Sequence, residues 1–281
     1  MDRDSIDILI IFFNKVEQTI CCINSFLASG QQIYVLNNGS DAKQESKLRN
    51  RFKGVDRIHI LNSGKNLGPA GGRNYLIKHT QSKWIFFVDN DIVIEPSNGW
   101  LEKFFCYIAN YTSAEVICPR IYNVHEGLYM DRLNVVISDN KLVLQRELSE
   151  VTNFFPEGGA IVNRSVFDRN GLYDEELFAF EGYEFALRAL RSMDGEIKVH
   201  HTNEFKLIHN HSFQKMSKDK EAVRERYNEH RMKASYDRLI NEYNITFSHD
   251  WHWWTKNQVA IMTTPKLILR IKQKISNILN R

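Results

Sequence analysis

An uninterrupted apolar run, Trp84 to Val88, ends on the acidic tripeptide Asp89-Asn90-Asp91. Such a run predicts a strand buried on both faces, as in a sheet that helices cover from two sides. The tripeptide then lies at the carboxyl end of the strand, where open α/β sheets bind ligands. Residues two apart in extended backbone point the same way, so the two carboxylates suit Mg²⁺ or Mn²⁺ that also carries substrate phosphates. An isolated D-x-D is usually a polar turn, so the neighbouring segments decide.

Strand-like and helix-like segments alternate through the N-terminal part of the chain. This alternation predicts an α/β fold with a mostly parallel, doubly covered (Rossmann-like) sheet. We expect strands at Asp7–Phe13, Ile33–Leu36, Ile58–Leu61 and Trp84–Val88, with helices at Val16–Ala28 and Ala70–His79. Further along we expect a hairpin in Leu128–Leu148, a strand at Gly159–Val162, and helices at Glu181–Ser192 and Ser217–Tyr243.

The composition narrows the class of protein. The chain has 281 residues, of which 43% are hydrophobic, so it can fill a core and is neither disordered nor fibrous. Its net charge of +3 creates no global field that would attract nucleic acid. The four cysteines have no metal-type spacing, which favours reduced thiols in a cytoplasmic protein. The start lacks a secretory signal pattern, and no apolar run is long enough to span a bilayer.

The loop from Asn66 to Asn74 is rich in glycine and precedes an expected helix. Small residues such as Gly68 let the backbone approach a bound group, and a helix N-terminus attracts an anion. Arg73 adds a permanently charged fork for phosphate or ribose. A tight packing turn is the alternative for the loop alone. The G-x-G-x-x-G spacing of a dinucleotide site is missing.

Taken in order, these motifs resemble those of the inverting family 2 glycosyltransferases, which have the GT-A fold. The resemblance implies that Phe13, Asn14, Asn37 and Asn38 hold the nucleotide, that Gly68, Arg73, Asp89 and Asn90 complete the donor site, and that Asp89 and Asp91 bind a divalent cation. An acidic residue is common in the family where this chain has Asn37, so the base preference stays open.

The resemblance extends to Phe155–Ala160 and Phe167–Glu175, which look like the acceptor side of the family. It predicts a GT-A domain at 1–215, with a nucleotide-sugar half at 1–118 and an acceptor half at 119–215. A helical C-terminal extension at 216–281 completes the expected organisation.

The family carries a Glu-Asp pair ahead of a helix, and the Asp often serves as the catalytic base. This chain has Glu181 followed by Gly182 at that place. Inverting transfer needs a carboxylate that removes the proton of the acceptor hydroxyl. We expect Glu181 to be the base and Glu184 to bind or orient the acceptor, although either glutamate could instead cap the helix.

His209 ends a short apolar segment. In related transferases a histidine at this place completes the metal site, and imidazole is an acceptable ligand for Mn²⁺. We therefore expect Asp89, Asp91 and His209 to hold Mn²⁺ or Mg²⁺. A lone histidine on a strand is more often an ordinary structural residue.

The C-terminal end combines tryptophans with a basic amphipathic stretch. Beyond Asp250 there are six Lys or Arg and no Asp or Glu, and residues 265–281 carry an apolar stripe with basic flanks. Such a stripe suits an anionic membrane surface, which would place the protein at the inner face of the cell membrane. Packing on the main domain or in an oligomer is the alternative.

We therefore expect a metal-dependent, inverting glycosyltransferase. It would move a sugar from a nucleoside diphosphate donor, with UDP-sugars favoured, to a hydroxyl of a glycan or a lipid-linked acceptor. A sugar-nucleotide pyrophosphorylase and a catalytically inactive carbohydrate-binding module are the alternatives. The sugar, the acceptor and the linkage stay open.

Overall fold

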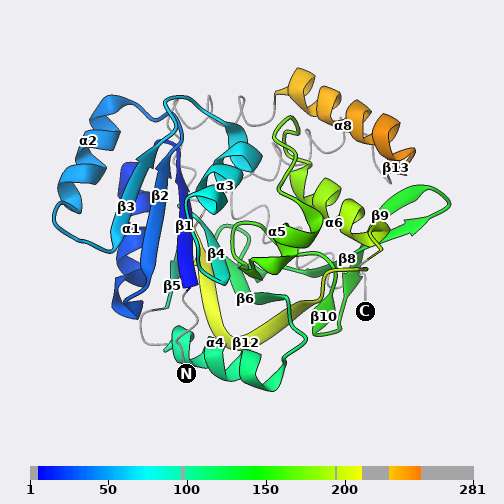
Figure 1. Cartoon of the computed structure of the whole chain (residues 1–281), viewed down its shortest axis with the longest axis horizontal. Helices are drawn as coiled ribbons and strands as arrows, with labels where there is room; N and C mark the ends of the chain where they lie inside the picture. The colour runs from blue at the N-terminus through cyan, green and yellow to red at the C-terminus, as the bar shows by residue number, and fades with distance from the viewer. Residues whose placement is uncertain (1–5, 96–98, 194, 211–227, 248–281) are drawn as a thin grey trace.

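The computed structural model describes residues 6–95, 99–193, 195–210 and 228–247. Within them one large curled sheet carries helices on both of its faces, and a smaller sheet lies at one side (Figure 1). The strands of the large sheet are β1 (Ile6–Phe12), β2 (Gln32–Asn37), β3 (Ile58–Asn62), β4 (Trp84–Asp89), β5 (Ile92–Ile94), β6 (Val116–Asn123), β7 (Leu128–Tyr129), β10 (Val151–Thr152), β11 (Ile161–Asn163) and β12 (Val199–His209). The helices are α1 (Val16–Phe26), the short 3-10 turn η1 (Leu27–Ser29), α2 (Ala42–Arg51), α3 (Gly68–Lys78), α4 (Trp100–Asn110), α5 (Ser165–Asn170), α6 (Glu181–Arg191) and α8 (Glu229–Tyr243).

The strand order is β10-β12-β6-β11-β4-β1-β2-β3, with β5 added beside β12 and β7 beside β6. Neighbours among β3, β2, β1 and β4 are parallel, and β6 is parallel to β12. The short strand β11 runs antiparallel to both β4 and β6, so it joins two parallel groups that point the same way. The α/β fold with a mostly parallel, doubly covered sheet is confirmed.

Two hydrophobic cores lie on opposite faces of this sheet because successive strand residues point to opposite sides. On β1, Ile8 and Ile10 face the core shared with α1 and α4, whereas Leu9 faces the core shared with α3, α5 and α6. All three of these strand residues are almost fully buried. A helix layer on each face therefore explains why the strands read as continuous apolar runs.

Polar residues gather where the parallel strands end. Phe12 at the end of β1 is in register with Asn37 of β2, and Ile11 is in register with Asp89 of β4. In the other parallel group, Asn123 of β6 is in register with His209 of β12. Residues that are distant in sequence thus meet at one edge of the sheet, as expected for an open α/β sheet.

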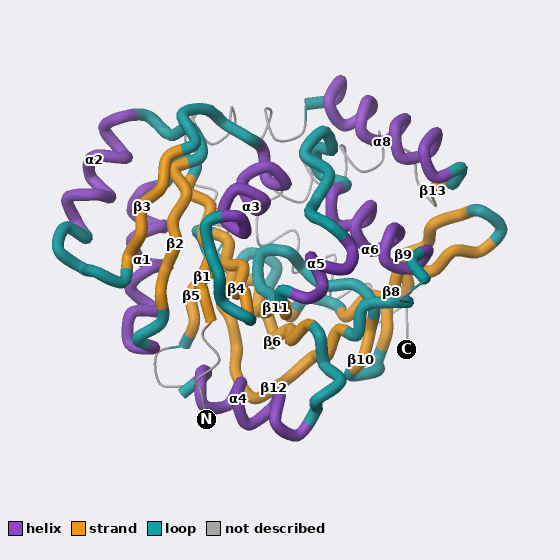
Figure 2. The backbone as a smooth tube through the Cα atoms, viewed as in Figure 1, coloured by secondary structure: helices purple, strands orange, loops and turns teal. Residues whose placement is uncertain are grey.

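The predicted hairpin within Leu128–Leu148 is confirmed as β8 (Arg132–Ser138) and β9 (Lys141–Glu147), which project at one side of the molecule (Figure 2). Positive φ angles at Asp139 and Asn140 form its tight turn. A further strand, β13 (Thr246–Phe247), pairs with β9. Residues of β8, β9, α6, α8 and β13 form a third core that includes Val135, Leu142, Leu187, Leu239 and Phe247.

Two expectations fall wholly or partly on residues that the structure does not describe. The expected helix Ser217–Tyr243 is described only from Asn228 onward. Asn228 caps the start of α8, because its side chain accepts hydrogen bonds from the backbone N–H groups of His230 and Arg231. The basic stretch 265–281 lies outside the described residues, so membrane contact stays a prediction. Within the described part of the chain, no helix is both long and apolar enough to cross a bilayer.

Candidate active site

A chain reversal after β4 places the acidic tripeptide beside β12. Asp89 ends β4, and β5 begins directly after Asp91 and runs antiparallel to β12, with Ile92 in register with His209. The N–H of Asn210 donates to the carbonyl oxygen of Asp91 over 2.9 Å, which fixes this register. The reversal therefore brings the end of the first parallel group to the end of β12.

The side chains of Asp89, Asp91 and His209 converge at this point. One ligand atom of each lies within 4.8 Å of the others, and Nε2 of His209 lies 3.1 Å from Oδ1 of Asp91. Nδ1 of His209 lies 3.0 Å from Oδ1 of Asn123, its register partner on β6. An amide oxygen only accepts, so this contact fits the tautomer that carries its proton on Nδ1, and in that tautomer Nε2 is the nitrogen that can bind a metal.

This donor set fits a divalent cation of the Mg²⁺ or Mn²⁺ type. Two carboxylates and one neutral imidazole suit Mn²⁺ well, and carboxylates suit Mg²⁺. The Asp89 side chain is 39% exposed, so a substrate phosphate can share the ion. Asp89, Asp91 and His209 thus lie together, as the sequence predicted.

Arg73 lies next to this cluster and is enclosed by carboxylates. Its Nη1 lies 3.2 Å from Oε1 of Glu181, and its Nη2 lies 3.8 Å from Oδ1 of Asp89. Only 9% of its side chain is exposed. Burial alone would lower the pKa of Arg73, but the negative charges of Glu157, Asp89 and Glu181 raise it above its usual range.

Glu157 is the carboxylate that sequence analysis did not select. Burial raises the pKa of Glu157 to about 8; Arg73 opposes this shift, and Glu181 and Asp89 add to it. Its Oε1 is enclosed and has no hydrogen-bond partner within the described residues. Glu157, Arg73 and Asp89 also line one small cavity of about 10 Å³, room for about a single water molecule.

Two glycines make this crowding possible. A Cβ atom on Gly158 would lie 2.2 Å from Oδ2 of Asp89, and a Cβ atom on Gly182 would lie 2.2 Å from Oε1 of Glu157. Both separations are far below van der Waals contact. The absence of a side chain at each position therefore leaves room for a carboxylate of the site.

The predicted nucleotide loops are tied to each other by side-chain amides. Nδ2 of Asn38 donates to the carbonyl oxygen of Gly68 over 3.1 Å, and Oδ1 of Asn38 accepts from the N–H of Leu67 over 2.9 Å. Gly68 has a φ of 73°, and a Cβ atom there would meet nothing within 4 Å. The first turn of α3 is thus held in place and remains open to an approaching group.

The remaining predicted donor residues lie at the same strand ends. Phe13 and Asn14 follow β1, and Oδ1 of Asn14 accepts from Nε2 of Gln44 over 3.0 Å. Asn37 donates to Oε2 of Glu45 over 2.7 Å. Asn90 donates to Oγ1 of Thr19 on α1 over 3.0 Å. These amides position the loops, and contact with a donor stays a prediction for each of them.

The family-model comparison decides the identity of this fold. The model described as glycosyl transferase family 2 matches residues 7–171, more than half of the chain. The chain belongs to glycosyl transferase family 2. It is therefore a glycosyltransferase, and the predicted family is confirmed. Nothing in the comparisons favours a pyrophosphorylase or an inactive binding module.

Curated relatives of this transferase include enzymes with assigned activities. It is 27% identical over 177 residues to the dTDP-rhamnosyl transferase RfbF of Shigella flexneri. The aligned region covers 60% of this chain and 57% of RfbF. It is also 27% identical over 168 residues to the pre-mycofactocin glycosyltransferase of Mycobacterium tuberculosis. This aligned region covers 58% of this chain and 34% of that enzyme. The chain thus spans less than two thirds of either relative.

Solved glycosyltransferase structures share the fold. Residues 1–349 of TarS from S. aureus superpose with a TM-score of 0.56 at 16% identity, covering 84% of this chain and 66% of that one. GalNAc-T7, crystallised with UDP, GalNAc and Mn²⁺, superposes with a TM-score of 0.58 at 13% identity, covering 90% of this chain and 56% of that one. At this identity the likeness concerns the fold, and it confirms the GT-A assignment.

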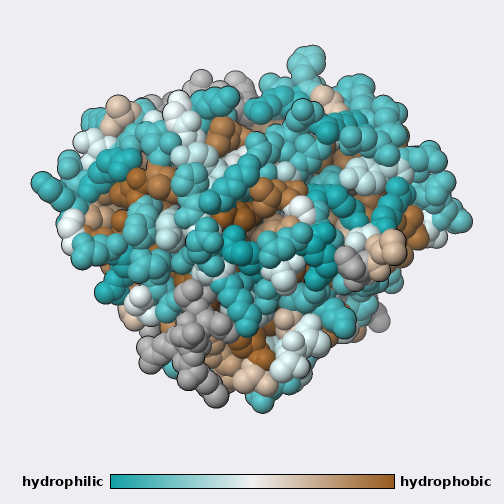
Figure 3. Space-filling view, viewed as in Figure 1, coloured by the Kyte–Doolittle hydropathy of each residue, from teal (hydrophilic) through white to brown (hydrophobic). Residues whose placement is uncertain are grey.

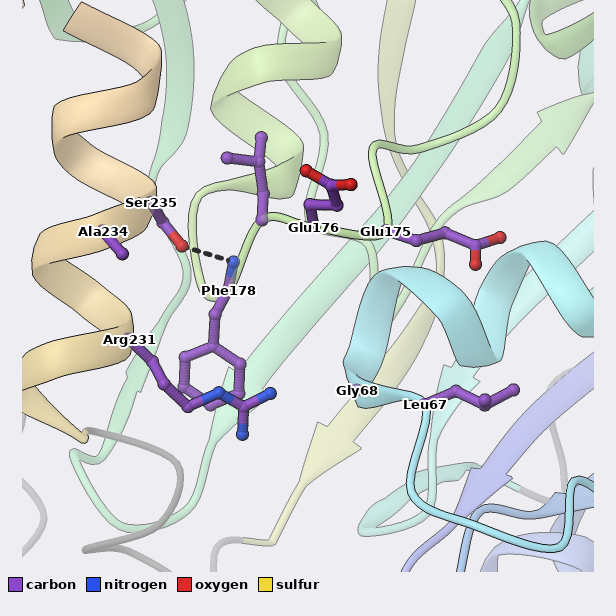
Figure 4. A pocket seen from close by; sticks show the side chains of 9 residues that line it. Leu67, Gly68, Glu175, Glu176, Phe178, Arg231, Ala234 and Ser235 are labelled. Carbon is purple, nitrogen blue, oxygen red and sulfur yellow. Dashed lines mark hydrogen bonds between the residues drawn. The ribbon is translucent and has the colours of Figure 1, made fainter.

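A second hollow of the transferase lies between α3 and α8 (Figure 4). Its volume is about 150 Å³, and it is lined by Leu67, Gly68, Glu175, Glu176, Leu177, Phe178, Arg231, Ala234 and Ser235. The guanidinium of Arg231 lies 4.3 Å from the centre of the Phe178 ring, and the N–H of Phe178 donates to Oγ of Ser235 over 2.8 Å. The face seen in Figure 3 is otherwise mostly hydrophilic, with hydrophobic side chains showing near the middle of the view. The hollow adjoins the predicted donor loop.

Glu184 belongs to a different network from Glu181. Its Oε1 accepts from Nε of Arg188 over 2.7 Å, and it also accepts from the hydroxyl of Tyr243 at the end of α8. The side chain of Glu184 is only 3% exposed. These contacts tie α6 to α8, which gives Glu184 a structural task alongside the acceptor role expected from the sequence.

Glu184→Gln should therefore lower stability more than rate. Replacing the buried carboxylate weakens its charge-assisted bonds to Arg188 and Tyr243, which are both partly exposed, so we expect the free energy of unfolding to fall by about 1–3 kcal/mol. Turnover at a temperature well below the melting transition should stay within about threefold of the parent. Urea unfolding and steady-state kinetics measure the two quantities. A large loss of turnover with unchanged stability would instead support the acceptor-binding role.

Sequence reasoning missed Glu157 and Asn123, and only Glu157 had a signal in the sequence. Glu157 directly precedes the pair Gly158-Gly159, which marks a close backbone approach, and the unusual Gly182 indicated space for another group. Asn123 has no local motif. Only the register between β6 and β12 reveals that it orients His209.

Proposed function

We propose that this glycosyltransferase moves a sugar from a nucleoside diphosphate donor to a hydroxyl of a glycan or lipid-linked acceptor, with inversion at the anomeric carbon. The observation that carries the proposal is the convergence of Asp89, Asp91 and His209 at the carboxyl ends of β4 and β12. A UDP-sugar is the favoured donor. TarS has been crystallised with UDP-GlcNAc and GalNAc-T7 with UDP. RfbF, named as a dTDP-rhamnosyl transferase, makes dTDP-rhamnose the first alternative donor.

Asp89, Asp91 and His209 would hold the cation, which when bound offsets the charge of the departing diphosphate. Arg73 lies beside Asp89 and supplies a fixed positive charge on the same side of the site. Phe13, Asn14, Asn37, Asn38, Gly68 and Asn90 would surround the nucleotide. Inverting attack also requires a carboxylate that takes the proton of the acceptor hydroxyl. Sequence reasoning assigns this role to Glu181, and Glu157 is a second candidate beside it.

A panel of nucleotide sugars tests the proposal most directly. The full chain is incubated with UDP-GlcNAc, UDP-glucose or dTDP-rhamnose, each with Mn²⁺, with Mg²⁺ or with a chelator. Water acts as the acceptor, so the assay measures hydrolysis of the donor. Release of free nucleoside diphosphate that depends on the cation is the expected result. Absence of release from every donor under all conditions would contradict the proposed function. Membrane contact through residues 265–281 is a separate part of the proposal, which sedimentation with anionic vesicles measures.

Asn123→Ala tests the cation site without removing a ligand. The change deletes the oxygen that orients His209, so we expect the affinity for Mn²⁺ to fall by about 10–100-fold while the fold stays intact. Calorimetric titration with Mn²⁺ in the presence of UDP measures the affinity. Asn134→Ala, which alters a partly exposed amide on β8, is the matched control and should leave it unchanged. Equal affinities in all three proteins would show that the contact of Asn123 with His209 does not support metal binding.

A further inference from the structure

Gly182 and Glu157 compete for one space. Gly182 is the second residue of α6, whereas Glu157 lies in the loop before β11. A Cβ atom on residue 182 would lie 2.2 Å from Oε1, 2.7 Å from Cδ and 3.1 Å from Oε2 of Glu157. The whole carboxyl group of Glu157 therefore occupies the place where a side chain at 182 would begin. Any residue other than glycine at 182 would displace it.

The other carboxylates of the site are committed to partners. Asp89 and Asp91 lie with His209 in the cation cluster. Glu181 is only 5% exposed; its Oε1 accepts from Nη1 of Arg73, and its Oε2 has no hydrogen-bond partner within the described residues. Glu184 is bound by Arg188 and Tyr243. Each of these contacts would have to break or be shared before the carboxylate concerned could serve an acceptor hydroxyl freely.

Glu157 differs from Glu181 in exposure and from Glu184 in having an oxygen without a partner. The residue as a whole is partly exposed, and its Oε1 is enclosed and has no hydrogen-bond partner within the described ranges. It lines the same small cavity as Asp89 and Arg73, which places it next to the proposed donor site. The next residue, Gly158, has no side chain, and the carboxylate of Asp89 occupies the place where a Cβ atom of residue 158 would lie.

We infer that Glu157 is the catalytic base of this transferase, held in place by the absence of a side chain at Gly182. This inference rests on the proposed function. In the step, the O–H bond of the acceptor breaks and its proton passes to the carboxylate of Glu157. The acceptor oxygen forms a bond to the anomeric carbon, and the bond from that carbon to the diphosphate oxygen breaks, releasing nucleoside diphosphate. Glu181 then acts as a positioning residue that holds Arg73.

Glu157→Gln is the first test, because it keeps the size of the side chain and removes the base. With the donor that gives the highest rate in the panel, we expect kcat to fall by about a hundredfold or more and the donor KM to stay within about threefold. Glu147→Gln, at the partly exposed end of β9, is the matched control and should keep both constants. Circular dichroism and thermal melting establish that each variant is folded. A Glu157→Gln enzyme with kcat within threefold of the parent, or one that loses only donor affinity, would overturn the inference.

Moving the carboxylate back to the helix is the second test. E157G empties the space and should be as slow as Glu157→Gln. The double variant E157G/G182D returns a carboxylate to the same space from α6, and we expect it to be at least about tenfold faster than E157G. A folded double variant no faster than E157G would contradict the shared-space argument. If the double variant does not fold, the Glu157→Gln result decides alone.

The two levels of the proposal fail in different ways. If the parent protein releases no nucleoside diphosphate from any donor, the proposed function is wrong and the role of Glu157 falls with it. If the parent is active and Glu157→Gln is equally active, only the assignment of the base is wrong. In that case Glu181→Gln, which sequence reasoning favoured, should show the large loss of kcat.

Discussion

Asp91→Ala should abolish cation-dependent binding of a nucleoside diphosphate. Asp91 supplies one of the atoms that converge with Asp89 and His209, and its side chain is 16% exposed, at the end of a strand rather than in the core. Loss of a partner that merely orients a metal ligand already costs about 10–100-fold in affinity or activity, so loss of a ligand should cost about a hundredfold or more. Calorimetry with UDP, in the presence of Mn²⁺ and of a chelator, measures the effect.

A matched control separates this result from a general loss of negative charge. Asp131→Ala removes an aspartate that is 50% exposed and pairs with Arg146, away from the cluster. It should bind UDP and Mn²⁺ as the parent does. If Asp91→Ala keeps the affinity that the parent shows with Mn²⁺, the cation does not bind at these residues, and the metal assignment is wrong.

Arg73→Met is expected to cause the largest loss of stability among the changes considered. The substitution removes the positive charge that Glu157, Asp89 and Glu181 surround, and it leaves Glu181 buried without its ion-pair partner. Removing one partner of a buried ion pair typically costs about 3–5 kcal/mol. Methionine replaces the aliphatic part of the arginine side chain with an unbranched, flexible one that fills irregular gaps, so the lost charge rather than a cavity should dominate. Urea unfolding measures the change in the free energy of unfolding.

The control for Arg73→Met is the same substitution at an exposed site. Arg146 is 81% exposed and pairs with Asp131, so Arg146→Met should change the free energy of unfolding by no more than about 1 kcal/mol. The deficit of Arg73→Met should also shrink as the pH is lowered, because protonation of the abandoned carboxylates removes their uncompensated charge. Equal effects of the two substitutions would mean that the carboxylates around Arg73 are not held by its charge.

The parts of the site that follow from local sequence were predictable. The run Trp84–Val88 fixes a buried strand, so Asp89 and Asp91 had to lie at its carboxyl end. The helix beginning at Glu181 is also confirmed, because its apolar and charged residues have a clear helical period. The fold class followed from the alternation of strands and helices, because the local pattern of each segment predicts its own secondary structure.

The missed parts depend on register and on close approach, which no local pattern contains. The three-residue strand β5 is too short to be recognised, although it brings Asp91 to His209. Asn123 orients His209 only because β6 and β12 pair in one register. The closeness of Glu157 to Gly182 arises where a loop before β11 meets the start of α6. Such contacts arise only when the whole chain has folded. In the sequence, a glycine at an unusual position is the one sign of the contact between Glu157 and residue 182.

The position of His209 has a consequence for the order in which the protein matures. Asp89 and Asp91 are made early, at the end of the first group of strands, but His209 is the last residue of β12. On a ribosome, the nascent chain would carry both aspartates for more than a hundred residues of further synthesis before the imidazole emerged beside them. A chain interrupted before β12 would have the acidic tripeptide and the glycine-rich loop, yet it would lack the nitrogen that completes the cluster. The complete cluster is therefore a property of the finished sheet.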